Sequence, residues 1–478
     1  MPLEDDDRRA VDRYLHDWLA QESLPGASVA IVRGDELAYA TGAGSRDLET
    51  NAPANPETLY GVGSVTKSFT ALAIAQLHDQ GDLDFEDSIA DHIDAIEDEQ
   101  FDATLHDLLC HASGLPSLAT SEVLIARQAG IGEYGIPMAD WEDFYHHLTE
   151  GFDERLDEPR FRYSNSGYVL LGEVVEAVDG RPFTTYVDEE ILQPLGMFRS
   201  TFAADEYAGD ANAATAYWMG GDDGDGDSGD SGPEAVPVPV REHSAAAGGL
   251  LTPVTELARY LRFNARGELD GERFVGDGSG SGDKIVSEAT LERLHAGHTD
   301  TPEGPYGYGW RRRKFLDRTL VGHGGSIGVS TAYVGFTEGG GGGEEDEWAV
   351  ALACNAAPDH GLAGPAQAML AAAMSEEPEA VPFVARRRAM ESFTGRYESY
   401  RGIKEAVVER DGATLRLSFE DIGGGGATPL VPVDPVDGAF EQPLDSGARR
   451  PVDFVQGDDG LECHVDRWRL HRVGPIGD

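Results

Sequence analysis

Lysine is scarce in this chain, and positive charge as a whole is low. Its 478 residues include only four lysines, at positions Lys67, Lys284, Lys314 and Lys404. Lysine and arginine together number 37, against 87 aspartates and glutamates, so the formal net charge is −50. Phosphate backbones and anionic lipid surfaces are bound through clustered positive charge. The composition therefore argues against nucleic acid and anionic membrane surfaces as partners. The chain is long enough to bury an enzyme-sized pocket, and we expect a small-molecule substrate.

The acidic excess runs along the whole length of the chain. Because 40% of the residues are hydrophobic, the excess indicates the surface of a folded protein and not a disordered one. In molar salt the screening length falls to about 3 Å, which removes most of the self-repulsion between such charges. We therefore expect the chain to come from a halophilic organism.

Cysteines and long apolar runs are also few. The three cysteines, Cys110, Cys354 and Cys463, are widely separated, which is typical of reduced thiols and not of a disulfide framework or a zinc knuckle. No apolar run is long enough to predict a membrane span or a signal peptide, so we expect a cytoplasmic protein. The sequence has no His-x-His or His-Glu-x-x-His cluster, and we expect neither a metal nor another cofactor.

The order of the predicted elements indicates an α/β (α+β) fold. Strands are predicted near both ends of the first 380 residues, over 27–44, 306–311, 318–322, 328–336 and 347–354. Helices are predicted over 8–21, 64–80, 104–110, 163–180, 183–192, 253–264 and 361–375. We expect a mainly antiparallel sheet that is built from both chain ends and flanked by helices, with a helical region inserted between them.

Composition divides the chain into two domains. The segment 375–382 contains two prolines and predicts a linker, so residues 1–380 form the first domain. Short alternating runs between frequent turns predict a small β-rich barrel or sandwich over 391–474. Within the first domain, the Gly- and Asp-rich stretch 220–240 predicts a solvated acidic loop.

The stretch GVGSVTKSFTALAIAQL, residues 61–77, contains a serine and a lysine three positions apart at the start of a predicted helix. Ser64 and Lys67 therefore lie about 60° apart on one helix face. A buried neutral amine can take the proton of a serine hydroxyl and make it a nucleophile. The unpaired N–H groups of a helix start favour the negative charge that develops next to that serine.

The same spacing also has an ordinary explanation. Ser64 would then be a helix cap and Lys67 a solvated charge, although a cation in the first turn opposes the helix dipole. A second Ser-x-x-Lys, Ser281 to Lys284, lies in a Gly- and Asp-rich loop that provides no helix to hold the pair together. The helical context therefore favours the first copy as the reactive one.

Two further motifs follow in the chain. Tyr163 and Asn165 form the only Tyr-x-Asn, just before a predicted helix, where a tyrosine can relay protons and an amide can bind a carbonyl. A packed aromatic and a helix cap are the alternatives. In VGHGGSIGVSTAYVGF, His323 begins His-Gly-Gly-Ser. The glycines, Gly325 among them, let a substrate backbone approach the strand closely, and the Ser326 N–H is a candidate oxyanion donor.

These three motifs, in this order, resemble those of the serine β-lactamase and penicillin-binding-protein superfamily. The Tyr-x-Asn and His-Gly-Gly elements are most similar to the class C β-lactamases and the related esterases and D-peptidases. LLCHASGLP (108–116), Leu195-Gly196-Met197 and AAGGLLTPVTELARYL (246–261) also resemble segments of that branch. The resemblance covers about residues 8–375 and implies a β-lactamase-like fold.

The resemblance implies a role for each motif residue. Ser64 would be acylated, with Lys67 as its base partner and Tyr163 as the proton relay that also activates the deacylating water. Asn165 would bind the acyl side chain, and the N–H groups of Ser64 and Ser326 would form the oxyanion hole.

His323 stands where β-lactamases of this superfamily usually carry the lysine of Lys-Thr-Gly. A mostly neutral imidazole is a weaker partner for a substrate carboxylate than an ammonium is. The departure argues against penicillin as the native substrate, and an ester, a small amide or a D-amino-acid peptide fits better.

Other interpretations stay open at this stage. Gly324 to Gly328 matches Gly-x-Ser-x-Gly, so an α/β-hydrolase-type esterase that uses Ser326 is one alternative, but its nucleophile elbow requires a helix after the serine. A non-catalytic recognition protein on the same scaffold is another. The C-terminal β-domain is either a cap over the substrate site or an assembly module, and the oligomeric state is not predicted.

Overall fold

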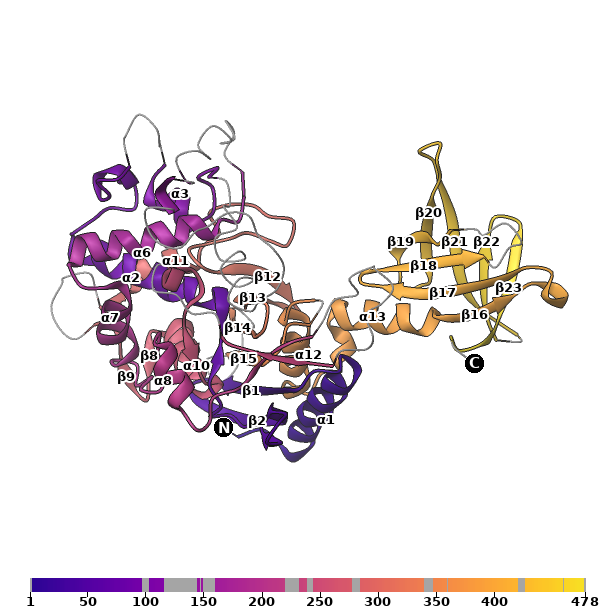
Figure 1. The fold of residues 1–478 in the computed structure, drawn as a ribbon, viewed down its shortest axis with the longest axis horizontal. Coiled ribbons are helices and arrows are strands. Elements are labelled where there is room, and N and C mark those ends of the chain that lie inside the picture. Colours follow the sequence, from indigo (N-terminus) through magenta and orange to yellow (C-terminus); the bar gives the residue numbers. More distant parts are fainter. Residues whose placement is uncertain are drawn as a thin grey trace. The chain divides into compact units, whose positions relative to one another are not determined.

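The computed structural model describes residues 2–96, 103–115, 144–146, 148, 160–219, 232–238, 244–276, 284–338, 347–358, 360–419, 426–458 and 460–476. These residues form two compact units, Met1–Ser375 and Glu376–Asp478. Figure 1 shows both units, and each is described by itself.

A seven-stranded sheet is the centre of the first unit. In spatial order its strands are β12 (Arg311–Phe315), β13 (Arg318–Ser326), β14 (Thr331–Glu338), β15 (Trp348–Cys354), β1 (Gly26–Arg33), β2 (Glu36–Asp47) and β3 (Ala52–Pro53). Every ladder in this sheet is antiparallel. β1 pairs directly with β15, which lies more than 300 residues later in the chain, so the sheet is assembled from both ends as predicted.

Helices cover the two faces of this sheet, which explains why its central strands are apolar. Along β15 every residue is buried, and along β1 all but the last residue are buried. α1 (Asp5–Gln21) and α12 (Ala363–Ala373) pack together against one face, and α10 (Val254–Arg266) packs against the other (Figure 1). A strand that is covered on both faces has no reason to alternate polar and apolar residues.

The inserted region is mainly helical and supports the site. Its helices are α2 (Thr66–Gln80), α3 (Leu105–Leu109), α6 (Asn165–Asp179), α7 (Phe183–Val187), α8 (Ala204–Gly209), α9 (Ala245–Gly248) and α11 (Glu288–His295). Its short strands are β4 (Tyr60–Gly61), β5 (Ala216–Trp218), β6 (Glu234–Val236), β7 (Leu251–Thr252), β8 (Glu268–Leu269), β9 (Glu272–Arg273), β10 (Val275–Gly276) and β11 (Val286–Ser287). α2 is buried along its first twelve residues and packs against α6, α9 and α11.

Some local predictions differ from the structure. The predicted strand 306–311 is wrong, because β12 begins only at Arg311 and Tyr306 forms isolated bridges. The alternation Tyr-Gly-Tyr-Gly-Trp mimics a strand, but Gly309 has φ +75°, which turns the chain. The predicted helix 183–192 is divided into two parts, the α-helix α7 and a π-helical turn, Asp188–Leu192. Most of the predicted acidic loop, 220–231 and 239–240, lies outside the described residues.

The second unit is a closed eight-stranded barrel preceded by α13 (Pro382–Phe393). Its strands are β16 (Gly395–Glu398), β17 (Glu405–Asp411), β18 (Thr414–Phe419), β19 (Thr428–Asp434), β20 (Ala439–Pro443), β21 (Arg449–Gly457), β22 (Gly460–Val465) and β23 (Trp468–Gly474). Consecutive strands are neighbours, and β23 returns to pair with β16. Alternating side chains such as Leu415 and Leu417 fill the interior. The prediction of a small β-rich barrel or sandwich is confirmed in its barrel form.

Long apolar helices and disulfides are both missing from the described residues. No helix there is both long and apolar enough to cross a membrane. Cys110, Cys354 and Cys463 are buried and do not form disulfides.

Candidate active site

Ser64 lies in a single 3₁₀ turn, Gly63–Val65, immediately before α2. The predicted helix therefore begins two residues later than expected, at Thr66. Gly63 has φ +53°, a conformation that glycine adopts without strain. The turn leaves Ser64 half-buried at the N-terminal end of a helix, where the helix dipole favours a negative charge.

Lys67 is fully buried, and its ammonium is surrounded by acceptors. Lys67 Nζ lies 3.0 Å from Ser64 Oγ, 2.7 Å from Asn165 Oδ1 and 2.7 Å from the Ala247 carbonyl oxygen. An ammonium has three N–H donors, so the three acceptors match it. When the proton that faces Ser64 is absent, the lone pair of Nζ is directed at Ser64 Oγ while Asn165 and Ala247 hold the other two N–H groups. This geometry suits transfer of the serine proton to Lys67.

The partners of Lys67 come from segments that are fixed to α2. Thr70 Oγ1 donates to the Ala246 carbonyl at 2.7 Å, and the Leu250 N–H donates to Thr66 Oγ1 at 3.1 Å. These bonds hold the 246–250 segment against the helix. The structure thus gives Asn165 a contact that the sequence did not predict, since its amide oxygen accepts a hydrogen bond from Lys67.

Tyr163 lies beside this lysine. Lys67 Nζ is 5.0 Å from the centroid of the Tyr163 ring and 5.4 Å from that of Tyr168. The Tyr163 ring also packs against the His111 ring, with 4.3 Å between centroids. Aromatic faces attract a cation, so the two tyrosines would stabilise the positive charge that Lys67 gains when it takes the serine proton.

The end of β13 lies directly against the Ser64 turn. A Cβ atom built on Gly325 would overlap the Val62 carbonyl oxygen and would lie 2.7 Å from Ser64 N. A Cβ atom on Gly63 would lie 2.6 Å from Ser326 N. Both positions therefore require glycine, and the close approach brings the backbone N–H groups of Ser64 and Ser326 together as the candidate oxyanion hole.

The surroundings of Ser326 do not form a nucleophile elbow. Ser326 is the last residue of β13, and the next element is the strand β14, which begins at Thr331. An elbow requires a helix after its serine. Ser326 Oγ is exposed and accepts a hydrogen bond from the Gly328 N–H at 3.1 Å.

His323 is buried, and its neighbours include two residues that the sequence analysis did not select. Its Nε2 atom lies 2.9 Å from the Tyr306 hydroxyl, which in turn lies 3.2 Å from His111 Nε2. Burial, together with the nearby charge of Lys67, lowers the pKa of His323 to about 3, so this imidazole is neutral. His111 occurs in the LLCHASGLP segment, and that was the only sequence signal for it. Tyr306 had no such signal because it lies in a segment that was predicted as a strand.

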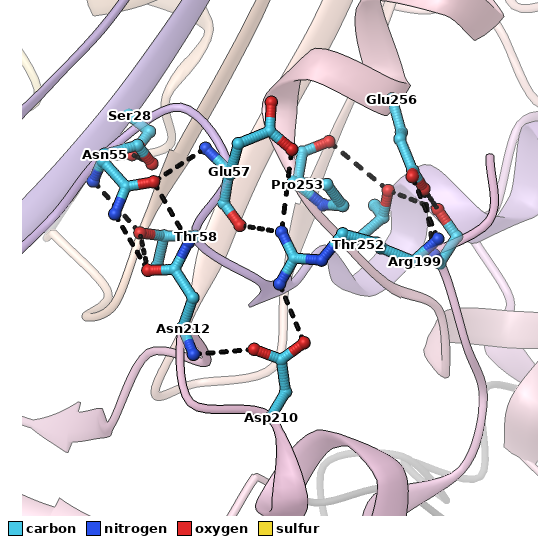
Figure 2. Close-up of polar contacts among 11 residues, drawn as sticks. Ser28, Asn55, Glu57, Thr58, Arg199, Asp210, Asn212, Thr252, Pro253 and Glu256 are labelled. Atoms are coloured by element: carbon cyan, nitrogen blue, oxygen red, sulfur yellow. Dashed lines mark hydrogen bonds and ion pairs between the residues drawn. The ribbon is translucent and has the colours of Figure 1, made fainter.

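A polar cluster holds the chain that leads into the Ser64 turn. Figure 2 shows its residues, Ser28, Asn55, Glu57, Thr58, Arg199, Asp210, Asn212, Thr252, Pro253 and Glu256. The amides of Asn55 and Asn212 bond to each other in both directions, at 2.8 and 3.0 Å. Arg199 Nη2 binds Asp210 Oδ2 at 2.8 Å. The Asn55 contacts fix the segment just before β4, which pairs with β7 and leads into the Ser64 turn.

Side chains and backbone here provide a candidate nucleophile, a candidate base beside it and two candidate oxyanion donors. This set suits acyl transfer. Within the described ranges, no group of three or more His, Cys, Asp and Glu side chains is placed to hold a metal ion.

Two protein-family models match this chain, and a solved structure is similar to nearly all of it. The family model "Beta-lactamase" matches residues 9–373, and the model "Pab87 octamerisation domain" matches residues 378–471. The structure of the octameric penicillin-binding protein homologue from Pyrococcus abyssi is similar over 97% of this chain and 99% of that chain, with a TM-score of 0.85 and 30% sequence identity.

Two curated relatives match part of the chain. Protein flp of Staphylococcus aureus (strain MW2) is 30% identical over 209 residues, which cover 43% of this chain and 40% of that protein. A β-lactamase of Providencia stuartii is 30% identical over 192 residues, which cover 40% of this chain and 46% of that protein. The matches thus span less than half the length of these relatives. The first family model, in contrast, spans most of the chain and includes Ser64, Lys67, Tyr163 and His323, so the chain belongs to the β-lactamase family.

Proposed function

We propose that this protein is a serine hydrolase that acts through an acyl-enzyme on Ser64, with Lys67 and Tyr163 as its acid–base groups. The observation that carries the proposal is the contact between Lys67 Nζ and Ser64 Oγ, 3.0 Å, with the other acceptors of Nζ placed to hold its remaining protons. A buried lysine that served only as a structural charge would have no need for a serine hydroxyl at the end of a helix.

In the proposed reaction, the Ser64 hydroxyl proton passes to neutral Lys67 while Ser64 Oγ bonds to the substrate carbonyl carbon. The N–H groups of Ser64 and Ser326 stabilise the oxyanion. Collapse of this intermediate breaks the bond to the leaving group, which receives a proton from Lys67 through Tyr163. A water molecule then attacks the ester carbon and gives a proton to Tyr163, which passes its own proton to neutral Lys67. Collapse of the second intermediate breaks the bond to Ser64 Oγ, and Lys67 returns the proton to that oxygen.

The neutral state of His323 limits which class of substrate the site can bind through a charged group. An imidazole with a pKa of about 3 supplies no positive charge to a carboxylate at neutral pH. We therefore favour esters, small amides and D-amino-acid peptides over β-lactams. Asn165 is proposed to contact the acyl group while its amide oxygen binds Lys67.

The proposal is tested by mapping the acyl-enzyme. Purified protein is treated with a fluorophosphonate probe, and the modified peptide is identified by mass spectrometry. We expect the adduct on the peptide that contains Ser64, and we expect it to persist in Ser326→Ala. The same preparation is assayed with p-nitrophenyl esters, nitrocefin and D-amino-acid amides. An adduct on Ser326 would support the esterase alternative, and no adduct together with no turnover would indicate a recognition protein.

We also propose that the barrel unit mediates self-association. The match of residues 378–471 to an octamerisation domain supports this role over that of a cap, and so does the likeness to an octameric homologue. Large apolar side chains are exposed on the barrel unit to an unusual degree: Tyr400, Ile403, Val433, Val436, Val455, Val473 and Ile476 are between 43% and 71% exposed. These side chains are available for contact with a second copy of the chain.

Replacement of two of these side chains is expected to weaken the assembly. The double variant Tyr400→Asp/Ile403→Asp adds charge where apolar contact is proposed, so the mass measured by light scattering in molar KCl should fall toward that of one chain, 51.3 kDa. Phe198→Asp is the matched control, because Phe198 is equally exposed but lies in the first unit. A wild type that is already monomeric would contradict the proposal.

A further inference from the structure

Four hydrogen bonds form one continuous chain behind Tyr163. The Ser164 N–H lies 3.1 Å from His111 Nδ1, and His111 Nε2 lies 3.2 Å from the Tyr306 hydroxyl. The Tyr306 hydroxyl lies 2.9 Å from His323 Nε2, and His323 Nδ1 lies 2.6 Å from the Gly324 carbonyl oxygen. His111, Tyr306 and His323 are all buried.

The two ends of this chain fix the direction of every bond in it. A backbone N–H can only donate, so His111 Nδ1 accepts, and the proton of a neutral His111 is on Nε2. That proton is donated to Tyr306, which donates its own proton to His323 Nε2. His323 then carries its proton on Nδ1 and donates it to Gly324. A carbonyl can only accept, so the far end independently requires the same tautomer.

The charges around both rings oppose protonation. Lys67 on α2 and Arg311 on β12 face His111 and His323, and Arg313 on β12 also faces His323. Burial is the larger cause, and it lowers the pKa of His111 well below its ordinary value and that of His323 to about 3.

The other charged and titratable groups near the two rings do not reverse the lowering of the His111 and His323 pKa values. Both arginines bind the carboxylate of Glu303, which is more than half exposed and only partly offsets them. The rings of Tyr163 and Tyr168 pack against the His111 ring, with 4.3 and 5.1 Å between centroids. The Tyr168 hydroxyl donates to the Leu109 carbonyl oxygen. A proton added to either ring would have to displace a hydrogen bond that the ring already accepts.

We propose that His111 and Tyr306 are positioning residues, which hold His323 as a neutral imidazole with its proton on Nδ1 and both ring nitrogens occupied. His323 then offers no N–H to a substrate, although it stands at the position of a substrate-binding residue. Its role is to fix the strand just before Gly325 and Ser326, and so to hold the oxyanion donor against the Ser64 turn. The kinetic part of this inference rests on the proposed function, but the hydrogen-bonded chain does not.

The tautomers are tested directly by NMR of protein labelled with ¹⁵N-histidine. The chain has fourteen histidines, and the signals of two are assigned by their loss in His111→Gln and His323→Gln. In the wild type we expect the proton on Nε2 of His111 and on Nδ1 of His323, with no titration of either between about pH 5 and 9. A His323 signal that shows the proton on Nε2, or that titrates in this range, would overturn the inference whether or not the protein is an enzyme.

Tyr306→Phe removes the central link with little change in shape. We expect His323 to lose its fixed tautomer and its pKa to rise, because Nε2 no longer accepts a hydrogen bond from Tyr306. Burial still keeps this pKa below the ordinary value, so the acid limb of the kcat pH profile should move only partway to higher pH. At neutral pH, kcat should fall on the order of tenfold, while KM changes little, because the donor geometry in the transition state is affected. Acylation is followed with the ester that the wild type turns over fastest.

Tyr207→Phe is the matched control, because it removes a buried hydroxyl that donates to the Ala214 carbonyl in another part of the unit. It should leave both kcat and the pH profile unchanged. If Tyr306→Phe does not fold, His111→Phe replaces it as the test variant, because it removes the hydrogen bond between His111 and Tyr306. Wild-type kcat and an unchanged pH profile in a folded Tyr306→Phe would rule out the positioning role, even where NMR confirms the chain.

Discussion

Lys67→Arg is expected to abolish acylation of Ser64 while it keeps a positive charge at the same position. Arginine cannot give up its proton in a protein, so it cannot serve as the base. General-base catalysis contributes about 10²- to 10⁴-fold, and the acylation rate should fall by that factor. The rate is measured by stopped-flow detection of p-nitrophenol release and by the mass of the acyl-enzyme, with Ser64→Ala as the blank.

The second Ser-x-x-Lys provides the control for this substitution. Lys284 is exposed, and its amine binds the Arg273 carbonyl, so Lys284→Arg makes the same chemical change away from the site. It should leave acylation unchanged. Circular dichroism of Lys67→Arg separates loss of the base from loss of the fold. Acylation that persists in a folded Lys67→Arg would transfer the role of base to Tyr163.

The rarity of lysine did not by itself distinguish these two copies. The sequence predicted the helix that holds Ser64 and Lys67, and the structure adds that Lys67 is completely buried among three acceptors. One of them, the Ala247 carbonyl, lies 180 residues away from Lys67 in the chain. Side-chain type and spacing predict which groups react, but contacts between such distant segments depend on tertiary packing.

The central sheet also shows which structural features the sequence pattern predicts and which it does not. Apolar strands near both ends of the first domain predicted one sheet, and the pairing of β1 with β15 confirms this. The segment 304–310 was not predictable by alternation, because its aromatic residues alternate with glycines and yet the chain turns at Gly309. Tyr306 was missed for this reason, and with it the chain of hydrogen bonds to His111 and His323.

The position of His323 is also explained by physical chemistry at the site. An ammonium there would repel the positive charge that Lys67 carries after it takes the serine proton. A neutral imidazole avoids that repulsion, and its two nitrogens are occupied by Tyr306 and Gly324. Under the proposed function, recognition of the substrate then depends less on a charged partner.

Gly325→Ala is expected to cause the second large loss of activity. An added Cβ atom would overlap the Val62 carbonyl oxygen and crowd the Ser64 N–H, so β13 and the Ser64 turn must separate. Separation removes one oxyanion donor from reach, and loss of one such donor costs about 10²- to 10³-fold in kcat. We expect kcat to fall by this factor, with a smaller change in KM, because the donors act mainly on the transition state.

Gly324→Ala is the control, since it makes the same change one residue earlier in the same strand. There an added Cβ atom would meet only Tyr333 Cδ2 at 3.7 Å and the Ala332 carbonyl oxygen at 3.8 Å, which are ordinary contacts. This variant should keep kcat within about twofold of the wild type, because side chains at ordinary contact distance require no movement of the backbone. Equal losses in both variants would mean that the strand as a whole is sensitive, and that the oxyanion hole does not depend on the approach of Gly325 to Ser64.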